Sequence, residues 1–311
     1  MSLRPLSVDP LWPRAGGWPS PDTIEPGGAI DLTLLGIPTW RTSLSPTGAG
    51  ATPSAVRDAL RYYAEFAAPD RSSRRRFERP LSQLVLTDAG DVEEPDGPEG
   101  EGRAIAAMAD AVGRASLVVA VGGDNALTVP AALGAWGGDL PTAGLITLDA
   151  HHDLRDGVSN GSPVRRLVEA GLAGKRIVQI GIADFANSAE YSKRAADYGI
   201  TVVHRDELHR RPIDDVMEEA LEIAGAAGGP IHVDLDVDVC DRSVAPGCPA
   251  SVPGGLAAWE LRHAARRAAA HPSVRSIDLA EVDATADAPD GRTVRLTALC
   301  VLEAVAGVAQ R

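Results

Sequence analysis

The chain lacks several features that mark other classes of protein. It has 3 cysteines, an odd number without a CxxC spacing, which argues against a disulfide framework and indicates a reducing, cytoplasmic setting. Its apolar runs fall well short of the roughly 18 residues that a membrane helix needs. The N-terminus also lacks the charged-then-apolar pattern of a secretion signal. We therefore expect no membrane partner.

Positive charge and aromatic residues are also scarce. The 30 Lys and Arg residues are outnumbered by 43 Asp and Glu residues, which gives a net charge of −13. Aromatic residues make up 4% of the chain, and no basic stripe is interleaved with them. Nucleic acid is therefore not an expected partner. If the aspartate clusters are metal ligands, bound cations neutralise part of this negative charge.

The remaining composition is that of an ordinary globular protein, with 44% hydrophobic residues in a chain of 311. Residues 1–30 contain six prolines and predict an irregular N-terminal arm, which either packs on the body or contacts another subunit. Residues 31–311 predict a single catalytic domain, because no linker separates two cores. Short apolar runs predict eight strands: 31–36, 84–88, 117–121, 144–148, 176–180, 201–203, 230–238 and 276–283.

Helical patterns occur between these runs, among them residues 54–63, 103–113, 164–171 and 297–308. Right-handed crossovers between successive strands then predict a largely parallel sheet covered by helices on both faces. The expected fold class is α/β, with three α/β/α layers and an eight-stranded, mainly parallel sheet. In such a sheet ligands bind beyond the carboxyl ends of the strands.

One stretch of ligand-type residues follows the fourth predicted strand. It reads Asp149-Ala150-His151-His152-Asp153, and the alternation of a strand points its first, third and fifth side chains to one side. Two carboxylates and an imidazole suit a borderline divalent metal and are costly to bury together without one. We interpret this stretch as part of a metal site.

A second acidic row lies on the seventh predicted strand, where Asp234, Asp236 and Asp238 share one face. Two such rows supply enough carboxylates to hold two divalent ions, an arrangement that turns a bridging water into hydroxide near neutral pH. The alternative is that either row is a solvated strand edge. Because both rows follow apolar strands, the metal interpretation is favoured, and it predicts a hydrolase.

These motifs resemble those of the ureohydrolase family, which comprises arginases, agmatinases and formimidoylglutamases. The resemblance includes Asp241, Pro246, the run Pro253-Gly254-Gly255-Leu256 and the run Glu281-Val282-Asp283, and it extends from the first strand to the last helix. It implies an arginase-like fold, a binuclear Mn²⁺ centre and hydrolysis of a C–N bond at an amidine or guanidine carbon. The family's trimers and hexamers imply a homo-oligomer.

The resemblance also implies roles for individual residues. Asp153 would contact the bridging hydroxide and pass a proton to the leaving amine, and Glu281 would bind the cationic amidinium. The alternative for Glu281 is a structural carboxylate at a strand end. The implied metal ligands are Asp149, His151, Asp153, Asp236 and Asp238.

One position departs from the family pattern. The run Gly-Gly-Asp-His normally follows the third strand and supplies a histidine to the more exposed metal, but this chain has Asn125 there. An amide oxygen is a weaker ligand than imidazole for manganese-type ions. We therefore expect one firmly held metal and one that is weak or absent. His152 is not an obvious substitute, because alternation points it to the opposite face.

The loop after the fourth strand bears on the substrate. Arg155 and the run Ser159-Asn160-Gly161-Ser162-Pro163-Val164-Arg165 look more like formimidoylglutamases than arginases, as does the run Gly181 to Ser188. Because arginine binds carboxylates bidentately, Arg155 or Arg165 could hold an acidic substrate, with Asn160 and Ser162 beside it. The alternative for Arg165 is a solvated helix start.

The sequence thus predicts a metal-dependent hydrolase of a small molecule, with N-formimidoyl-L-glutamate as substrate and L-glutamate and formamide as products, in histidine degradation. Two alternatives are open. One is a guanidino-acid hydrolase or agmatinase that releases urea. The other is a catalytically weak family member with an assembly or regulatory role, which the asparagine at position 125 would explain.

Overall fold

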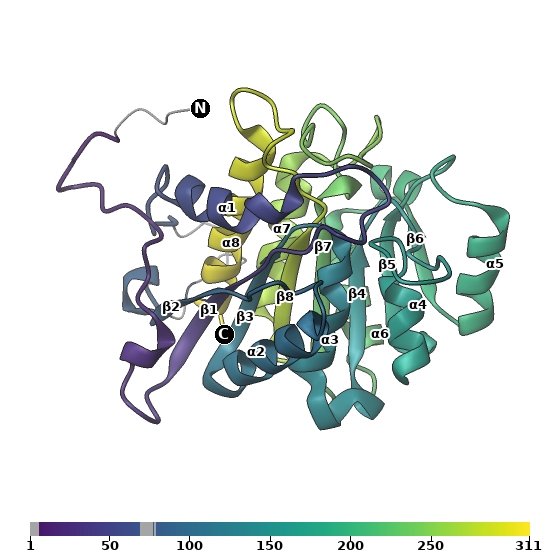
Figure 1. The fold of residues 1–311 in the computed structure, drawn as a ribbon, viewed down its shortest axis with the longest axis horizontal. Coiled ribbons are helices and arrows are strands. Elements are labelled where there is room, and N and C mark those ends of the chain that lie inside the picture. Colours follow the sequence, from purple (N-terminus) through teal and green to yellow (C-terminus); the bar gives the residue numbers. More distant parts are fainter. Residues whose placement is uncertain (1–5, 69–76, 78) are drawn as a thin grey trace.

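The computed structural model describes residues 6–68, 77 and 79–311, and shows three layers with a sheet between two layers of helices (Figure 1). All strand pairs are parallel, and the strand order is β2-β1-β3-β8-β7-β4-β5-β6. The predicted fold class is confirmed. The strands are β1 (Ile30–Ile37), β2 (Leu86–Asp91), β3 (Ala115–Gly122), β4 (Gly144–Leu148), β5 (Ile177–Ile182), β6 (Thr201–His204), β7 (Ile231–Asp236) and β8 (Val274–Ala280).

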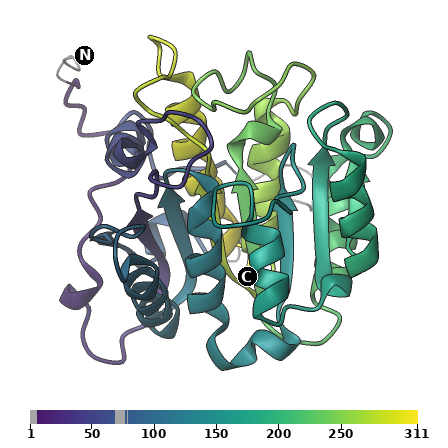
Figure 2. The same cartoon turned by 45° about the vertical axis from the view of Figure 1, so that its right-hand side comes forward.

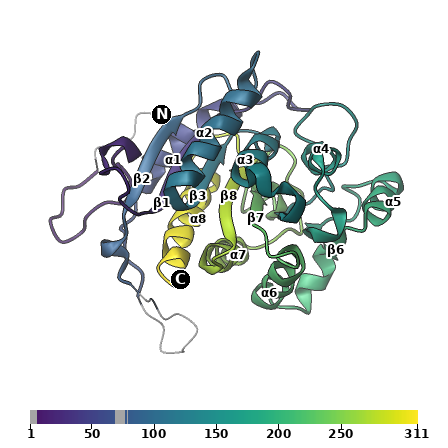
Figure 3. The same ribbon diagram turned by 90° about the horizontal axis from the view of Figure 1, so that it is seen from below.

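Four helices cover each face of the sheet (Figures 2 and 3). One face packs against α1 (Thr52–Leu60), α6 (Ile213–Ala224), α7 (Ala258–Ala270) and α8 (Arg292–Val308). The other packs against α2 (Gly100–Arg114), α3 (Thr128–Trp136), α4 (Pro163–Ala170) and α5 (Ala189–Tyr198). Helices α5, α6 and α7 have no counterpart among the elements predicted from the sequence. In α5 the reason is plain, because only Ala195 is buried and its apolar stripe is narrow.

The alternation of β7 places its acidic residues on one face, as predicted. Ile231, Val233 and Leu235 enter the core beneath α6 and α7, whereas the even-numbered residues face the opposite helix layer, where the ring of His232 meets Trp136 of α3 edge-on. All six β7 residues are buried, as expected for a strand in the centre of a parallel sheet.

The seventh and eighth strands end earlier than the sequence predicted. Their pairing stops at Asp236 opposite Ala280, rather than continuing to residues 238 and 283. The chain after β7 turns into a 3-10 helix at Val237–Val239, because the Asp236 side chain accepts a hydrogen bond from the Asp238 N–H at 2.8 Å. Asp238 therefore reaches its position through a capped turn and not through strand alternation.

The described part of the N-terminal arm, residues 6–29, is irregular apart from a 3-10 turn at Pro21–Thr23. It lies along the body through backbone hydrogen bonds from Ala15 to Tyr63 and from Asp88 to Pro19, both 2.9 Å. A role for the arm in subunit contact stays a prediction. No helix in the described ranges combines the length and apolarity needed to cross a membrane.

A buried charge cluster joins α7 to α8 and provides a test of this packing. Glu303 is 5% exposed and accepts hydrogen bonds from Arg262 and Arg266 of α7. We expect Glu303→Ala to lower the free energy of unfolding by about 2–3 kcal/mol, because it leaves two guanidinium groups without their carboxylate. Urea denaturation measures this change. The exposed pair Lys193–Asp197 is the control, since Asp197→Ala should leave the midpoint almost unchanged. Equal effects of the two variants would contradict the prediction.

Candidate metal centre

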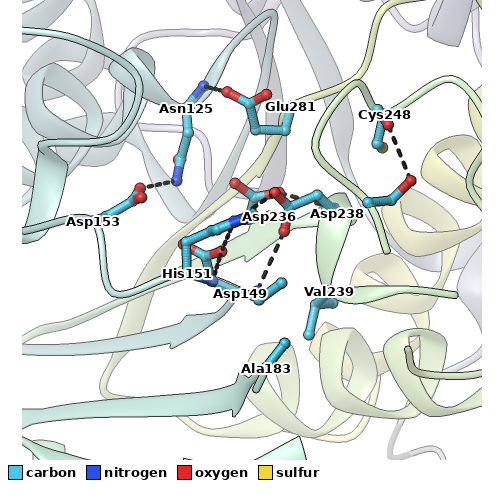
Figure 4. A network of polar contacts seen from close by, with 12 residues as sticks. Asn125, Asp149, His151, Asp153, Ala183, Asp236, Asp238, Val239, Cys248 and Glu281 are labelled. Atoms are coloured by element: carbon cyan, nitrogen blue, oxygen red, sulfur yellow. Dashed lines mark hydrogen bonds and ion pairs between the residues drawn. The ribbon is translucent and has the colours of Figure 1, made fainter. Parts of the chain in front are cut away.

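The predicted ligands converge at the carboxyl ends of four adjacent strands. In the order β3-β8-β7-β4, these strands lie in the middle of the sheet. Asn125 follows β3, Glu281 follows β8, Asp236 ends β7 and Asp149 follows β4. Figure 4 shows these side chains pointing toward one another. The ends of these four strands thus bring the predicted ligand residues together, and their role as ligands stays a prediction.

Two groups of ligand atoms share Asp149. Asp149, His151 and Asp238 form one group, and Asp149, Asp153 and Asp236 form the other; within each group the ligand atoms lie within 4.8 Å of one another. His151 Nδ1 lies 2.9 Å from Asp238 Oδ2 and 3.3 Å from Asp149 Oδ1. A carboxylate common to two groups can bridge two ions. The geometry therefore fits a binuclear site rather than two separate sites.

The ligands after β4 are brought together by the hydrogen bonds of a loop and not by the strand alternation that the sequence suggested. The strand ends at Leu148, and the following backbone is held by side chains of the site. The N–H of Ala150 donates to Asp238 Oδ1 at 3.2 Å, and the N–H of His151 donates to Asp149 Oδ1 at 2.6 Å. Asp153 adopts a left-handed backbone with φ of 53°. The three ligands meet because of a hydrogen-bonded loop.

Burial and mutual repulsion or attraction shift the pKa values of the titratable groups in this cluster. Burial and the charge of Asp238 raise the pKa of Asp149 to about 6. Burial and the charge of Asp149 raise the pKa of Asp153 well above its usual range, and burial with Asp238 does the same for Asp236. Burial opposes a charge on His151, but the charges and hydrogen bonds of Asp238 and Asp149 outweigh it and raise its pKa to about 12.

The chemistry of the cluster fits divalent cations. Among the described residues, His151 is the only cationic side chain within ion-pair distance of these carboxylates. Asp149 Oδ2 is buried without a hydrogen-bond partner. A donor set of four carboxylates and one imidazole suits Mn²⁺ and similar ions, which also supply the missing positive charge.

Asn125 lies beside the second group. Its Nδ2 donates to Asp153 Oδ2 at 2.8 Å, and its Oδ1 accepts from the Thr128 hydroxyl at 2.6 Å. The amide nitrogen, which cannot bind a cation, therefore faces the carboxylate, and the amide oxygen is engaged elsewhere. Both the expected role of Asn125 as a weak ligand and the strength of that second metal position stay predictions.

Glu281 is fixed on one side and open on the other. Its Oε1 accepts from the N–H of Asn125 at 2.9 Å and from Asn160 Nδ2 at 2.5 Å. Burial raises its pKa to about 8, against these two hydrogen bonds. Its φ is 60°, so it shares with Asp153 a backbone conformation that costs non-glycine residues roughly 1–3 kcal/mol. Such strain is a feature of functional sites, and the two residues are the ones predicted to be catalytic.

A cavity of about 360 Å³ opens onto the metal-binding groups. Its floor includes His151, Asp153, Asp236, Asp238 and Glu281, and its rim includes Arg155, Asn160 and Phe185. The side chain of Arg155 has no ion-pair partner among the described residues, so a cation stands free at the rim. The cavity can therefore take a small molecule that carries a cationic group at one end and an anionic group at the other.

The structure places the other two predicted substrate-binding residues away from this cavity. Arg165 is 9% exposed; it donates to the carbonyl of Arg155 at 2.6 Å and to that of Gly157, and it pairs with Glu169. The Ser162 hydroxyl donates to the carbonyl of Ser159 at 2.8 Å. Both residues therefore brace the loop that carries Arg155. This geometry disfavours direct substrate contact by either, because their donors are already engaged.

Other lining residues were not among the predicted site residues. Most of those named below come from loops after β1, β5 and β7, strands that also end at the carboxyl edge of the sheet, and Tyr191 comes from α5. The strand-end rule signals these loops without selecting the residues within them. The additional lining residues include Leu44, Ser45, Phe185, Asn187, Tyr191 and Pro249.

Comparisons with known proteins agree with this geometry. The formimidoylglutamase of Halalkalibacterium halodurans is 32% identical over 283 residues, which cover 84% of this chain and 82% of that protein. The crystal structure of formimidoylglutamase from Bacillus subtilis superposes with a TM-score of 0.86 at 27% identity, covering 99% of this chain and 96% of that one. Trypanosoma cruzi formiminoglutamase with Mn²⁺₂ superposes with a TM-score of 0.78 at 26% identity, covering 91% and 94%. The family model for the Arginase family matches residues 30–307, and this chain belongs to that family.

Proposed function

We propose that the chain hydrolyses the C–N bond of a linear amidine, N-formimidoyl-L-glutamate, and releases L-glutamate and formamide. The observation that carries this proposal is the pair of ligand groups sharing Asp149 at the floor of a cavity whose rim bears Arg155, a cation without an ion-pair partner in the part of the chain that the structure describes. The similarity to formimidoylglutamases over most of the chain supports the same substrate.

The residues that would hold two Mn²⁺ ions are the members of the two groups. Asp149 would be shared, His151 and Asp238 would complete one position, and Asp153 and Asp236 the other. When bound, two such ions supply a hydroxide near neutral pH and electrostatic support for a tetrahedral centre. The protein contributes the fixed geometry of buried carboxylates at the bottom of the cavity.

The chain's own groups orient the substrate. Glu281 Oε1 is occupied by Asn125 and Asn160, so Oε2 is the oxygen that can accept an N–H of the amidinium. Asp153 lies across the cavity floor, where a carboxylate can hold a proton and deliver it to the leaving amine. Arg155 can bind a substrate carboxylate bidentately. Agmatine has no carboxylate that could pair with this arginine. Arg155 therefore favours an acidic substrate over agmatine.

Assembly and location are further proposals that follow the family resemblance. We propose a homo-oligomer, a trimer or a hexamer, in the cytoplasm. Sedimentation equilibrium of the purified protein distinguishes these assemblies from a monomer.

Product identity tests the substrate. With added Mn²⁺, we expect N-formimidoyl-L-glutamate to yield formamide and glutamate in equal amounts, because the attacked carbon carries hydrogen in place of the third nitrogen of a guanidine. Amino-acid analysis and NMR measure both products. Faster release of urea from a guanidino acid would favour the guanidino-acid hydrolase, and no turnover over a broad panel of amidines and guanidines would favour the catalytically weak alternative.

Arg155 tests how the acidic end is bound. We expect Arg155→Ala to raise KM for formimidoylglutamate by about ten- to hundredfold with a smaller change in kcat, since a charge-assisted hydrogen bond to the substrate is lost. Steady-state kinetics measure the two parameters. Arg166→Ala is the matched control, because that arginine pairs with Glu101 and does not line the cavity. Unchanged KM in Arg155→Ala would contradict the role.

Asn125 tests the asymmetry of the two metal positions. After removal of metal with a chelator, we expect titration with Mn²⁺ to show one tight and one weak site in the parent protein. Asn125→His should strengthen the weak site by about tenfold or more, because imidazole is the better donor. Isothermal titration calorimetry measures both constants. Two equally tight ions in the parent protein would contradict the prediction.

A further inference from the structure

The loop after β4 carries three of the predicted ligands, and side chains bond several of its backbone polar groups. Asn187 lies at the end of the loop after β5. Its Oδ1 accepts from the N–H of His152 at 2.9 Å, and its Nδ2 donates to the carbonyls of Ala150 at 2.9 Å and Ala183 at 3.2 Å. One amide thus fastens the loop after β5 to both sides of His151.

A second amide holds the same loop from below. Gln179 of β5 is 0% exposed, and its Nε2 donates to the carbonyl of His152 at 2.9 Å. Its Oε1 lies 2.8 Å from His152 Nδ1, so this ring nitrogen carries the proton in that contact. The other ring nitrogen lies 3.3 Å from the Ser192 hydroxyl. His152 is therefore engaged at both nitrogens and points away from the metal-binding groups.

We propose that Asn187 and Gln179 form an amide clamp that presets the positions of Asp149, His151 and Asp153 before metal binds. Backbone groups of Ala150 and His152 alternate with the ligand side chains, so fixing these two residues fixes the ligands between and beside them. Both amides are positioning residues, because their hydrogen bonds go to the backbone and side chain of the ligand loop and neither belongs to the metal-binding groups. This inference rests on the proposed function, because it concerns the same metal-binding groups.

Each position in the clamp requires a side chain that both donates and accepts hydrogen bonds, as an amide does. Asn187 accepts at one atom and donates twice at the other, and Gln179 donates to a carbonyl and accepts from a ring N–H. Without Asn187 the N–H of His152 loses its acceptor, and without Gln179 the carbonyl of His152 loses its donor, so the loop would rearrange when either amide is removed. Displaced ligands would have to return to their positions when metal binds. The free energy of this reorganisation would lower the affinity for the metal.

The experiment measures Mn²⁺ affinity of chelator-treated full-length protein by calorimetry, together with the thermal midpoint of the metal-free form. We expect Asn187→Ala to raise the Mn²⁺ Kd of the tighter site by about ten- to hundredfold, the usual cost of removing a group that orients a ligand. Gln179→Met, which keeps the length of the side chain and removes its hydrogen bonds, should act in the same direction. Either variant alone tests the clamp if the other does not fold.

Ser188→Ala is the matched control. Ser188 is the next residue, and its hydroxyl caps α5 by accepting from the N–H of Tyr191 at 3.2 Å. We expect this variant to lower the thermal midpoint while its Mn²⁺ Kd stays within about twofold of the parent, because helix capping does not touch the ligand loop.

The outcomes separate the two proposals. If the folded Asn187→Ala and Gln179→Met proteins bind Mn²⁺ as the parent does and differ only in thermal midpoint, the amides serve stability alone and the clamp is refuted. If the parent itself binds no Mn²⁺, the proposed function fails and the clamp fails with it. A weakened Mn²⁺ affinity confined to the two amide variants supports the clamp.

Discussion

The confinement of negative charge at the carboxyl edge of the sheet is the constraint on which the rest of the structure depends. Asp149, Asp153, Asp236, Asp238 and Glu281 are all buried in one crevice. Carboxylates repel one another strongly where water is excluded, and one histidine offsets only part of that repulsion. The cluster is therefore costly to the fold by itself and becomes favourable when divalent cations bind. The affinity of such a site for divalent cations depends on how its ligands are arranged before the cations bind.

The remainder of the fold serves to maintain that arrangement. The central strands deliver one ligand segment each, and a buried parallel sheet is stiff because both of its faces are packed. The loops then complete the geometry through hydrogen bonds. Two strained residues, Asp153 and Glu281, persist in left-handed conformations because neighbouring groups hold their side chains. Asn125 contacts both of them, which places this unusual position at the centre of the polar network (Figure 4).

The cavity is lined by an acidic residue, Glu281, and by a basic residue, Arg155. The proposed substrate, with a cationic amidine and an anionic tail, would match this pair. Arg165 of α4 shows why a basic residue near a cavity need not bind substrate. Its guanidinium donates to the carbonyls of Arg155 and Gly157, and in this way it supports the loop that carries Arg155. The same pattern, with an amide in place of the guanidinium, occurs at Asn187 in the loop after β5.

The sequence by itself determined the class of fold and supplied the candidate ligands. Apolar runs separated by helical patterns identify the strands, because a buried parallel strand has to be hydrophobic on both faces, and acidic residues at two strand ends identify a metal site. Tertiary structure decided the rest. Asp149 belongs to both ligand groups because the fold brings residues far apart in the chain together. The capped turn that positions Asp238 and the hydrogen bonds that engage Arg165 are local contacts, but strand and helix periodicity does not describe them. Periodicity describes where a side chain leaves one element, whereas a loop's hydrogen bonds depend on which other loops the fold brings beside it.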